Sequence, residues 1–226
     1  MTRKPPAPAS HAARSLGQGR LVVISGPSGS GKTTICRALA ERDDVRLSVS
    51  ATQRKKRKGE VNGVDYWFLS PQVFEERVAS GDFLEHAAYN DNRYGTLRSV
   101  VDEMLHQVPV VILEIEVQGT RQLRDRGTEA TYVFVMPPSL AELERRLRAR
   151  STEDEATIQR RLQIAREEMD MAHLYDHVVI NEKLDETLDQ VRSLLGLKGA
   201  ASSADDSAHD EDDCGLSNGI EDDDDL

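Results

Sequence analysis

Gly26-Pro27-Ser28-Gly29-Ser30-Gly31-Lys32-Thr33 is the stretch that decides the fold, because it matches the pattern G-x-x-x-x-G-K-S/T at every fixed position. An apolar run at 21–24 comes just before it, and apolar residues recur at helical spacing after Thr33. In a strand–loop–helix context, the glycines let consecutive backbone N–H groups and the helix N-terminus face a phosphate. A chance match in a turn rich in glycine and serine is the alternative. The context favours a site for a nucleoside triphosphate.

Two side chains of this motif have predicted chemical roles. Lys32 is expected to bridge the β- and γ-phosphates, and Thr33 is expected to hold Mg²⁺. The residues predicted to bind ATP here are Gly26, Pro27, Ser28, Gly29, Ser30, Gly31, Lys32, Thr33 and Thr34.

Strand and helix patterns alternate outward from the motif. Apolar runs at 110–113, 132–135 and 178–180 predict further buried strands. Ser70-Pro71 predicts a helix start and Gly81 its end, while Ser139 with Glu142 forms a capping-box sequence before another helix. Helical spacing also recurs over 158–169 and 188–195. The alternation predicts an α/β fold in which helices flank a parallel sheet on both faces.

Two segments interrupt this alternation and are candidates for substrate-covering insertions. Residues 48–97 are polar and predict short strands plus one helix, which makes a mixed α+β insertion. Residues 145–161 are rich in arginine and predict a helical lid. The predicted domain therefore runs over 20–197 and includes both insertions.

The composition separates this domain from two tails. The 226 residues carry a net charge of −11, but 199–226 hold 11 acidic residues and no Lys or Arg; subtracting them leaves 29 acidic against 29 basic residues. We predict a disordered acidic tail over 198–226, with partner docking or metal scavenging as the alternative. Residues 1–19 predict a flexible arm or, alternatively, a transit sequence.

Location and partners follow from what the sequence lacks. The chain has no apolar run of the roughly 18 residues that a bilayer-spanning helix needs. Its two cysteines, Cys36 and Cys214, are too few and too far apart to suggest a disulfide framework. We therefore expect a cytoplasmic protein with no membrane or nucleic-acid partner. The sequence does not predict its oligomeric state.

A basic segment inside the first insertion carries the acceptor chemistry. Residues 50–66 read SATQRKKRKGEVNGVDY, in which Arg54 and Arg57 lie three residues apart and could together hold one phosphate. Alone, such a segment could equally be a solvated basic loop or a nuclear-type patch. With its surroundings, however, it resembles the guanylate kinase signature S-x-T-T-R-x-P-R-x-G-E-x-x-G-x-x-Y. The segments 83–86 (FLEH), 93–96 (RYGT), 114–119 (EIEVQG) and 137–139 (PPS) follow in that family's order.

The resemblance covers about 20–196 and implies a Mg²⁺-dependent kinase that transfers the γ-phosphoryl group of ATP to GMP, and to dGMP as well. It implies that Glu85 accepts the two adjacent N–H donors of guanine, while Ser50 and Thr96 donate to the 6-keto oxygen. Glu114 follows an apolar strand, as acids near Mg²⁺ often do, and the resemblance also brings it to the guanine. The implied GMP-binding residues are Ser50, Arg54, Arg57, Glu60, Tyr66, Glu85, Tyr94, Thr96 and Glu114.

The same resemblance assigns the charged groups that meet the moving phosphoryl. Phosphoryl transfer requires charge neutralisation more than covalent help. The implied catalytic residues are Lys32, Arg146, Arg150 and Arg161. Asn181 is implied to lie near the adenine of ATP. Other arginines of the segment, Arg145, Arg148 and Arg160, fit a solvent-exposed helix face.

The chain departs from the family pattern at several positions. Gln53, Lys55, Lys56, Arg93 and Ser151 replace the usual residues, and Glu116 stands where the family usually has Asp. Two other functions therefore stay open: an inactive guanylate-kinase-like module that binds proteins, and a kinase for ribosyl bisphosphates. The intact glycine-rich loop at 26–33, a P-loop, argues against the first function. Glu85 and Tyr94 indicate a nucleobase as part of the acceptor, which argues against the second function.

Overall fold

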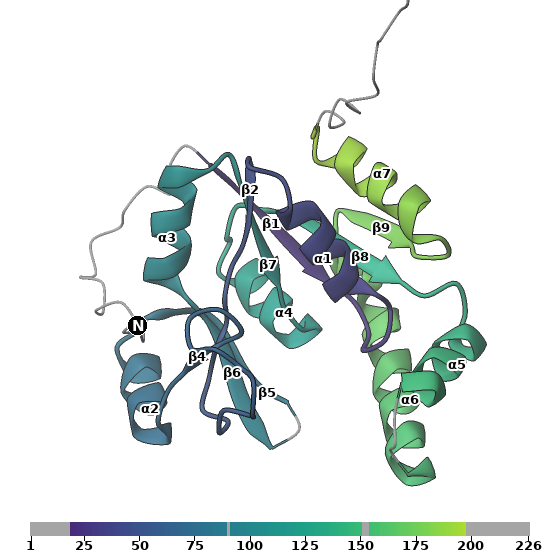
Figure 1. Ribbon diagram of the computed structural model, residues 1–226, viewed down its shortest axis with the longest axis horizontal. Helices are drawn as coiled ribbons and strands as arrows, with labels where there is room; N and C mark the ends of the chain where they lie inside the picture. The colour runs from purple at the N-terminus through teal and green to yellow at the C-terminus, as the bar shows by residue number, and fades with distance from the viewer. Residues whose placement is uncertain (1–18, 90, 151–153, 198–226) are drawn as a thin grey trace, which may run out of the picture.

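The computed structural model describes residues 19–89, 91–150 and 154–197 (Figure 1). Its core is a parallel five-stranded sheet in the order β2-β7-β1-β8-β9. The predicted strands correspond to β1 (Arg20–Ser25), β7 (Val110–Glu114), β8 (Thr131–Met136) and β9 (His177–Ile180). The predicted parallel sheet is thereby confirmed. Except for Gly19, the two predicted tails lie outside the described residues.

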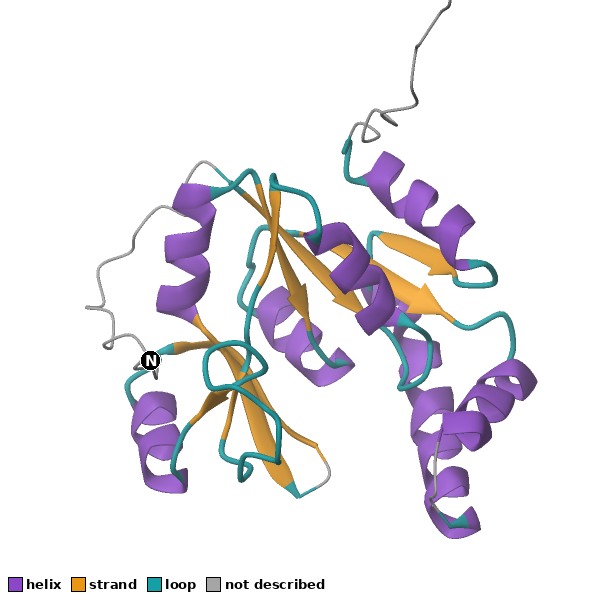
Figure 2. Cartoon of the chain, viewed as in Figure 1, coloured by secondary structure: helices purple, strands orange, loops and turns teal. Residues whose placement is uncertain are grey.

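Helices cover both faces of this sheet, as Figure 2 shows. Side chains alternate across a strand, so Val22 and Ile24 of β1 pack under α1 (Lys32–Ala40) and α7 (Leu184–Leu194). Leu21 and Val23 pack on the other face with α3 (Arg98–Gln107), α4 (Val117–Asp125) and the short 3₁₀ helix η1 (Met171–Leu174). Burial on both faces explains why β1 reads as an unbroken apolar run.

One predicted buried strand is an edge strand instead. Val178 and Ile180 of β9 are 43% and 57% exposed, and only Val179 is fully buried. The apolar run therefore predicted the strand but not its place at the border of the sheet. At the opposite border, β2 (Val45–Leu47) was not predicted, because it has three residues and Val45 alone among them is buried.

The first insertion folds as its polar pattern predicts, with short strands and a helix. Its sheet has the order β4-β3-β6-β5, formed by β3 (Ala51–Thr52), β4 (Trp67–Phe68), β5 (Phe83–Tyr89) and β6 (Asn92–Leu97). The helix is α2 (Pro71–Ala79), and the hydroxyl of Ser70 caps it by accepting from the N–H of Val73. The insertion packs around its own apolar cluster, which includes Trp67, Phe74 and Phe83.

The arginine-rich segment forms two helices, α5 (Leu140–Arg150) and α6 (Glu155–Asp170), which extend beyond the predicted limits of 145–161. Leu143, Leu147 and Leu162 are buried between them. Ser139 caps α5 through the N–H of Glu142 at 3.1 Å. The carboxylate of Glu142 instead binds the guanidinium groups of Arg145 and Arg146, so only half of the predicted capping box forms. No helix among the described residues is long and apolar enough to cross a membrane.

Candidate active site

The glycine-rich loop joins β1 to α1 and leaves the first turn of α1 open. Gly26, Gly29 and Gly31 have φ values of 150°, 93° and 96°, which side-chain-bearing residues rarely adopt. Gly31 is the N-cap residue of α1, and no side chain caps the helix there. The free N–H groups and the helix dipole therefore make an anion-binding end.

Residues from the far end of the sheet and from the lid hold this loop. The amide Nδ2 of Asn181, which follows β9 and is buried, donates to the carbonyl oxygen of Ser30 at 2.7 Å. Arg146 donates to the carbonyl oxygens of Asn181 and Ser30 at 3.1 and 3.5 Å. Arg161 donates to the hydroxyl of Ser28 at 2.6 Å. Three of the predicted ATP-side residues thus contact the loop itself. The side chain of Arg150 lies outside what the structure describes, as does Ser151.

A cavity of about 150 Å³ lies between the loop and the lid. Leu147 and Arg161 line it from α5 and α6. The glycine-rich loop and α1 supply the other lining residues, Ser28, Gly29, Gly31, Lys32, Thr33 and Thr34. This cavity adjoins the uncapped N-terminus of α1, where the phosphates of ATP are predicted to bind.

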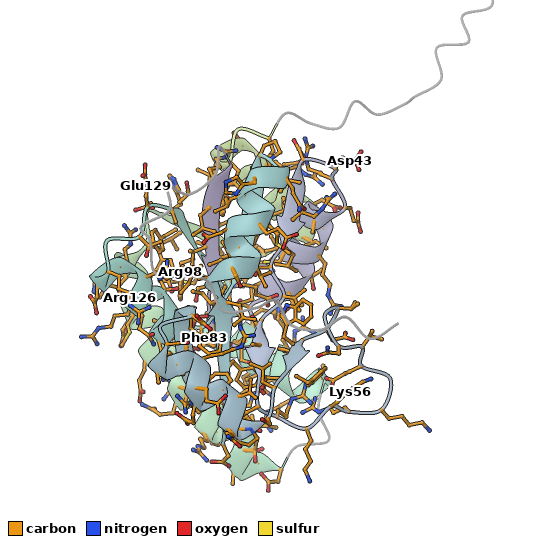
Figure 3. The ribbon with its side chains drawn as sticks, turned by 90° about the vertical axis from the view of Figure 1, so that its left-hand side faces the viewer. Asp43, Lys56, Phe83, Arg98, Arg126 and Glu129 are labelled. Atoms are coloured by element: carbon orange, nitrogen blue, oxygen red, sulfur yellow. The ribbon has the colours of Figure 1, made fainter. Side chains whose placement is uncertain are left out.

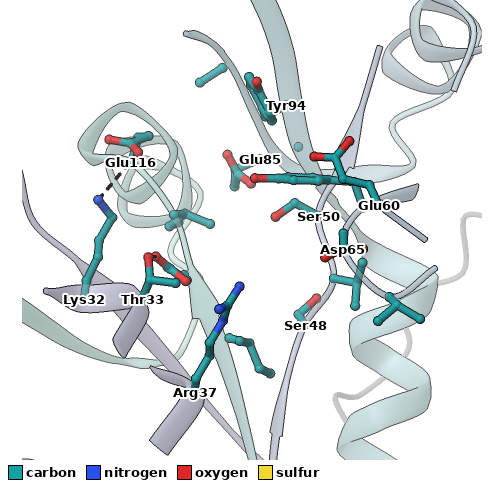
Figure 4. Close-up of a pocket in the computed structure, with 18 residues that line it drawn as sticks. Lys32, Thr33, Arg37, Ser48, Ser50, Glu60, Asp65, Glu85, Tyr94 and Glu116 are labelled. Carbon is teal, nitrogen blue, oxygen red and sulfur yellow. Dashed lines mark hydrogen bonds and ion pairs between the residues drawn. The ribbon is translucent and has the colours of Figure 1, made fainter. Parts of the chain in front are cut away.

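A larger cavity of about 570 Å³ extends from the loop into the first insertion (Figure 4). Lys32 and Thr33 line its loop end. The predicted GMP-binding residues that line it are Ser50, Glu60, Tyr66, Glu85, Tyr94 and Glu114. The structure therefore brings residues from six separate stretches of sequence around one space of a size that suits a nucleotide.

Glu85 is a buried carboxylate at this cavity. It is 4% exposed, and its Oε1 accepts from the hydroxyl of Thr96 at 2.6 Å. Burial raises the pKa of Glu85 to about 7, although the hydrogen bond from Thr96 opposes the rise. Thr96 itself does not line the cavity. The hydroxyl of Thr96 donates to Glu85, whereas the resemblance implies a bond from this hydroxyl to the 6-keto oxygen of guanine.

Neighbouring elements position this carboxylate. The pairing of β5 with β6 is irregular between Phe83 and Glu85, a bulge that changes the direction of the side chains. A Cβ added to Gly119 of α4 would lie 2.4 Å from Oε2 of Glu85, so the carboxylate occupies the space that the glycine leaves. Gln122 exchanges two hydrogen bonds with the backbone of His86, at 3.2 and 2.6 Å, and ties α4 to β5. Sequence reasoning missed the roles of Gly119 and Gln122. Gly119 is the last residue of the EIEVQG segment, and Gln122 lies three residues after it.

The predicted phosphate-binding arginines, Arg54 and Arg57, do not line the cavity. Both terminal nitrogens of Arg54 donate to Glu60, at 2.6 and 3.1 Å, and the N–H of Arg57 donates to the same carboxylate at 2.6 Å. The Arg54 guanidinium lowers the pKa of Glu60. Arg54 also lies over the ring of Tyr66, 5.4 Å from its centroid. Glu60 therefore folds the basic segment back on itself, while Arg57 is exposed.

The rest of the basic segment projects into solvent. Lys56 extends from the loop away from the sheets in Figure 3. Arg126, on the other side of the insertion, donates to the carbonyl oxygens of Phe83 and Leu84 and secures the start of β5. Lys55 and Lys56, which differ from the guanylate kinase signature, thus lie on an exposed loop beside the cavity rather than in its wall.

Oxygen atoms suited to a magnesium ion meet at the loop end of the large cavity. The hydroxyl of Thr33 donates to Oε1 of Glu114 at 2.5 Å. Hydroxyl and carboxylate oxygens are ligands that Mg²⁺ prefers, and this ion usually takes few protein ligands and completes its shell with phosphates and water. The described residues hold no cluster of three or more His, Cys, Asp or Glu that would form an all-protein cage. These two side chains therefore fit a substrate-linked Mg²⁺ site.

Two carboxylates, those of Glu116 and Glu168, lie near the P-loop lysine. The ammonium of Lys32 lies 3.7 Å from Oε1 of Glu116, at the start of α4. Glu168 of α6 lies near Glu116, and burial, followed by the charge of Glu116, raises the pKa of Glu168. Sequence reasoning missed Glu168, which no local motif marks. Because Glu168 is on α6, this contact links the lid to the lysine.

Comparisons with known proteins agree with this geometry. A family model described as guanylate kinase matches residues 18–197. A guanylate kinase of Clostridioides difficile (strain 630) is 45% identical over 179 residues, which are 79% of this chain and 87% of the relative. One of Zymomonas mobilis is 48% identical over 180 residues, 79% of this chain and 83% of that protein. The crystal structure of guanylate kinase from Anaplasma phagocytophilum superposes with a TM-score of 0.64 at 30% identity and covers 80% of this chain and 86% of its own.

Proposed function

Since the chain belongs to the guanylate kinase family and transfers a phosphoryl group from ATP to GMP, we propose how its residues divide that reaction between a donor end and an acceptor end. The observation that carries the proposal is the large cavity, which joins Lys32 and Thr33 of the P-loop to the buried carboxylate of Glu85. One end has the chemistry for a triphosphate and the other has the chemistry for a guanine.

At the donor end, the backbone of residues 26–33 binds the phosphates of ATP, and Lys32 neutralises the charge that develops on the transferred group. Arg146 and Arg161 act from the lid on the same phosphates, a role supported by their present contacts with Ser30 and Ser28. Arg150 acts with them by resemblance. Asn181 is proposed to lie near the adenine, and its bond to Ser30 supports a role in holding the loop as well.

At the acceptor end, Glu85 in its ionised form accepts the ring N–H and the exocyclic amine of guanine. Adenine does not present two adjacent donors at that edge, so a buried carboxylate discriminates between the bases. Ser50, Thr96 and Glu114 complete the base site. Arg54, Arg57, Tyr66 and Tyr94 hold the phosphate of GMP, for which Arg54 must exchange part of its pairing with Glu60. Glu60 keeps the segment folded. We extend the same proposal to dGMP.

Magnesium would be held by Thr33, with Glu114 adjacent. When bound, the ion withdraws negative charge from the phosphate oxygens. The contact between the Thr33 hydroxyl and the Glu114 carboxylate supports this assignment, since both oxygens are hard ligands.

A cytoplasmic location is part of the proposal, and the buried free thiol of Cys36 is consistent with a reducing compartment. The partners that we propose are ATP and GMP, without nucleic acid or membrane. The two other functions that the sequence left open, an inactive protein-binding module and a ribosyl bisphosphate kinase, are not favoured by relatives that are guanylate kinases over most of the chain.

A coupled ADP-release assay over GMP, dGMP, AMP, CMP and UMP tests the proposed base recognition. We expect turnover with GMP and dGMP and a rate lower by ~10²-fold or more with AMP, because a buried carboxylate would be left unpaired. Equal rates with GMP and AMP would contradict the role of Glu85. Binding of phosphopeptides without any turnover would instead support the protein-binding module.

A further inference from the structure

Arg37 has no role in the site as described so far, yet it lines the large cavity. It lies on α1, four residues after Thr33 and therefore on the same face of the helix. Figure 4 shows its guanidinium group between Thr33 and Ser48, directed into the space that the two ends of the site share. Its side chain is exposed.

The charges around the cavity are unbalanced. Among the described residues that line it, the cations are Lys32 and Arg37 alone. The carboxylates that line it are Glu60, Asp65, Glu85, Glu114 and Glu116. A dianionic nucleotide therefore enters a space whose walls carry more acidic than basic groups, so each cation in the wall has a large share in attracting it.

The other charged groups of the wall already have partners in the protein. Lys32 pairs with Glu116, and Glu114 accepts from Thr33. The remaining carboxylates accept from protein donors: Glu60 from Arg54, Asp65 from the N–H of Val61, and Glu85 from Thr96. By contrast, no hydrogen bond or ion pair joins the guanidinium of Arg37 to another described residue. It is the charged group of the wall that remains available to a ligand.

We propose that Arg37 is a further substrate-binding residue, which contacts the phosphate of the bound GMP and holds it toward the P-loop. This inference rests on the function proposed above and adds a phosphate contact to it. The acceptor phosphate has to lie at the Thr33 end of the cavity, next to the donor, and a guanidinium binds phosphate through charge-assisted and often bidentate bonds. The base end, at Glu85 and Ser50, lies beyond its position (Figure 4). The smaller cavity at the glycine-rich loop does not include Arg37.

A purely structural role would also place an arginine here, because Arg37 lies in the last turn of α1, where a cation favours the helix dipole. The two roles differ in what they bind. A phosphate contact affects GMP but not guanosine, which has the same base and ribose and no phosphate. A helix-end role affects thermal stability and neither ligand.

The test uses the full chain with Arg37→Met, Arg37→Lys and the matched control Arg46→Met. Methionine keeps the length and helix propensity of the side chain without its charge. Arg46 is exposed on the neighbouring strand β2, contacts the backbone carbonyls of Asp43 and Val45, and does not line the cavity, so its loss changes the net charge equally. Calorimetry measures the Kd of GMP and of guanosine, and steady-state kinetics measure KM for ATP and GMP.

We expect Arg37→Met to weaken GMP binding by ~10- to 100-fold, the range for one charge-assisted bond to a ligand. Guanosine binding and KM for ATP should not change, Arg37→Lys should recover part of the affinity, and Arg46→Met should match the wild type. Unchanged GMP binding, an equal loss of guanosine binding, an effect confined to KM for ATP, or a lower Tm alone would each overturn the inference. Wild-type protein that bound no GMP would instead refute the proposed function.

Discussion

Replacing Glu85 with glutamine tests base recognition separately from phosphate binding. The substitution keeps the shape of a side chain that is 4% exposed and fits against Gly119. The oxygen that accepts from Thr96 is retained, while the second oxygen, Oε2, becomes a donor amide. That amide would oppose one of the two N–H groups of guanine, whereas the phosphate contacts would be unchanged. We expect GMP turnover to fall by ~10- to 200-fold, equivalent to one lost bidentate contact and a desolvated mismatch, and AMP to gain relative to GMP.

The raised pKa of Glu85 adds a dependence on pH that has a definite sign. Guanine requires the ionised carboxylate, and with a pKa of about 7 the ionised fraction is about nine-tenths at pH 8 and about one-tenth at pH 6. The Kd of GMP should therefore rise by about tenfold as the pH falls from 8 to 6. In Glu85→Gln this contribution should vanish, so the ratio of the two profiles cancels the titration of the GMP phosphate itself.

Folding stability should rise as the pH falls, whereas the affinity for GMP should fall. A carboxyl group whose folded pKa is raised, here from an ordinary 4.5 to about 7, stabilises the fold below its unfolded pKa. That stabilisation is lost as the pH rises through 7, which corresponds to roughly 3 kcal/mol. The ligand-free glutamine variant should thus be more stable than the wild type at pH 8, by of the order of 1–3 kcal/mol after the cost of an unpaired amide. Thermal unfolding at pH 5 and pH 8 measures this difference. A variant that keeps both the wild-type preference for GMP and its pH profile would refute the reasoning, and the guanine would then be read by Glu114 or Ser50.

Three further substitutions test other parts of the site. Lys32→Ala should lower kcat by ~10²–10³-fold or more without lowering Tm, because a preorganised cation is lost from a phosphate-binding loop; surviving activity in the ADP-release assay would place the triphosphate elsewhere. Gly119→Ala should raise KM for GMP at least ~10-fold and leave KM for ATP unchanged, since its Cβ would lie 2.4 Å from Oε2 of Glu85. Asn181→Ala removes the 2.7 Å bond to the Ser30 carbonyl, so KM for ATP should rise and unfolding should become easier by about 1–3 kcal/mol; an unchanged Tm would show that the bond does not hold the loop.

The sequence predicted the central strands and the border strand β9 but missed the other border strand, β2, and burial explains the difference. β1, β7 and β8 are buried on both faces, so their side chains form continuous apolar runs. A border strand such as β2 is paired on one side only, and its exposed Arg46 breaks the apolar pattern. The helices α3 and α4 were not predicted either. Neither has a side-chain N-cap hydrogen bond, so the usual start signal was absent.

The site was predictable where it depends on local chemistry and not where it depends on packing between elements. The glycine-rich loop is a contiguous motif, and its conformation follows from its glycines. The contact between Thr96 and Glu85 could have been found by treating 83–97 as a hairpin, because Tyr89 pairs with Asn92 and the register then places Thr96 opposite Glu85. The fit of Glu85 against Gly119 arises from the way α4 packs on β5. No spacing in the chain encodes that contact.

The pairing of Arg54 with Glu60 bears on how the affinity for GMP arises. Arg54 is engaged with Glu60 through two hydrogen bonds, so a phosphate that binds Arg54 must share or displace a carboxylate, and it gains only the difference between the two interactions. The same pairing holds the arginine in place before substrate arrives, which reduces the entropy lost on binding. Arg37 lacks such a partner among the described residues, so its contact with phosphate would displace no protein carboxylate. Binding would instead cost the conformational entropy of its free side chain. GMP binding therefore combines a preorganised arginine, Arg54, whose net contribution to the binding free energy is reduced, with an unpaired arginine, Arg37, whose contribution is not reduced in this way. If the two arginines share one phosphate, removing both charges should weaken GMP binding by less than the sum of the two single losses. If they do not share a phosphate, the two losses should add.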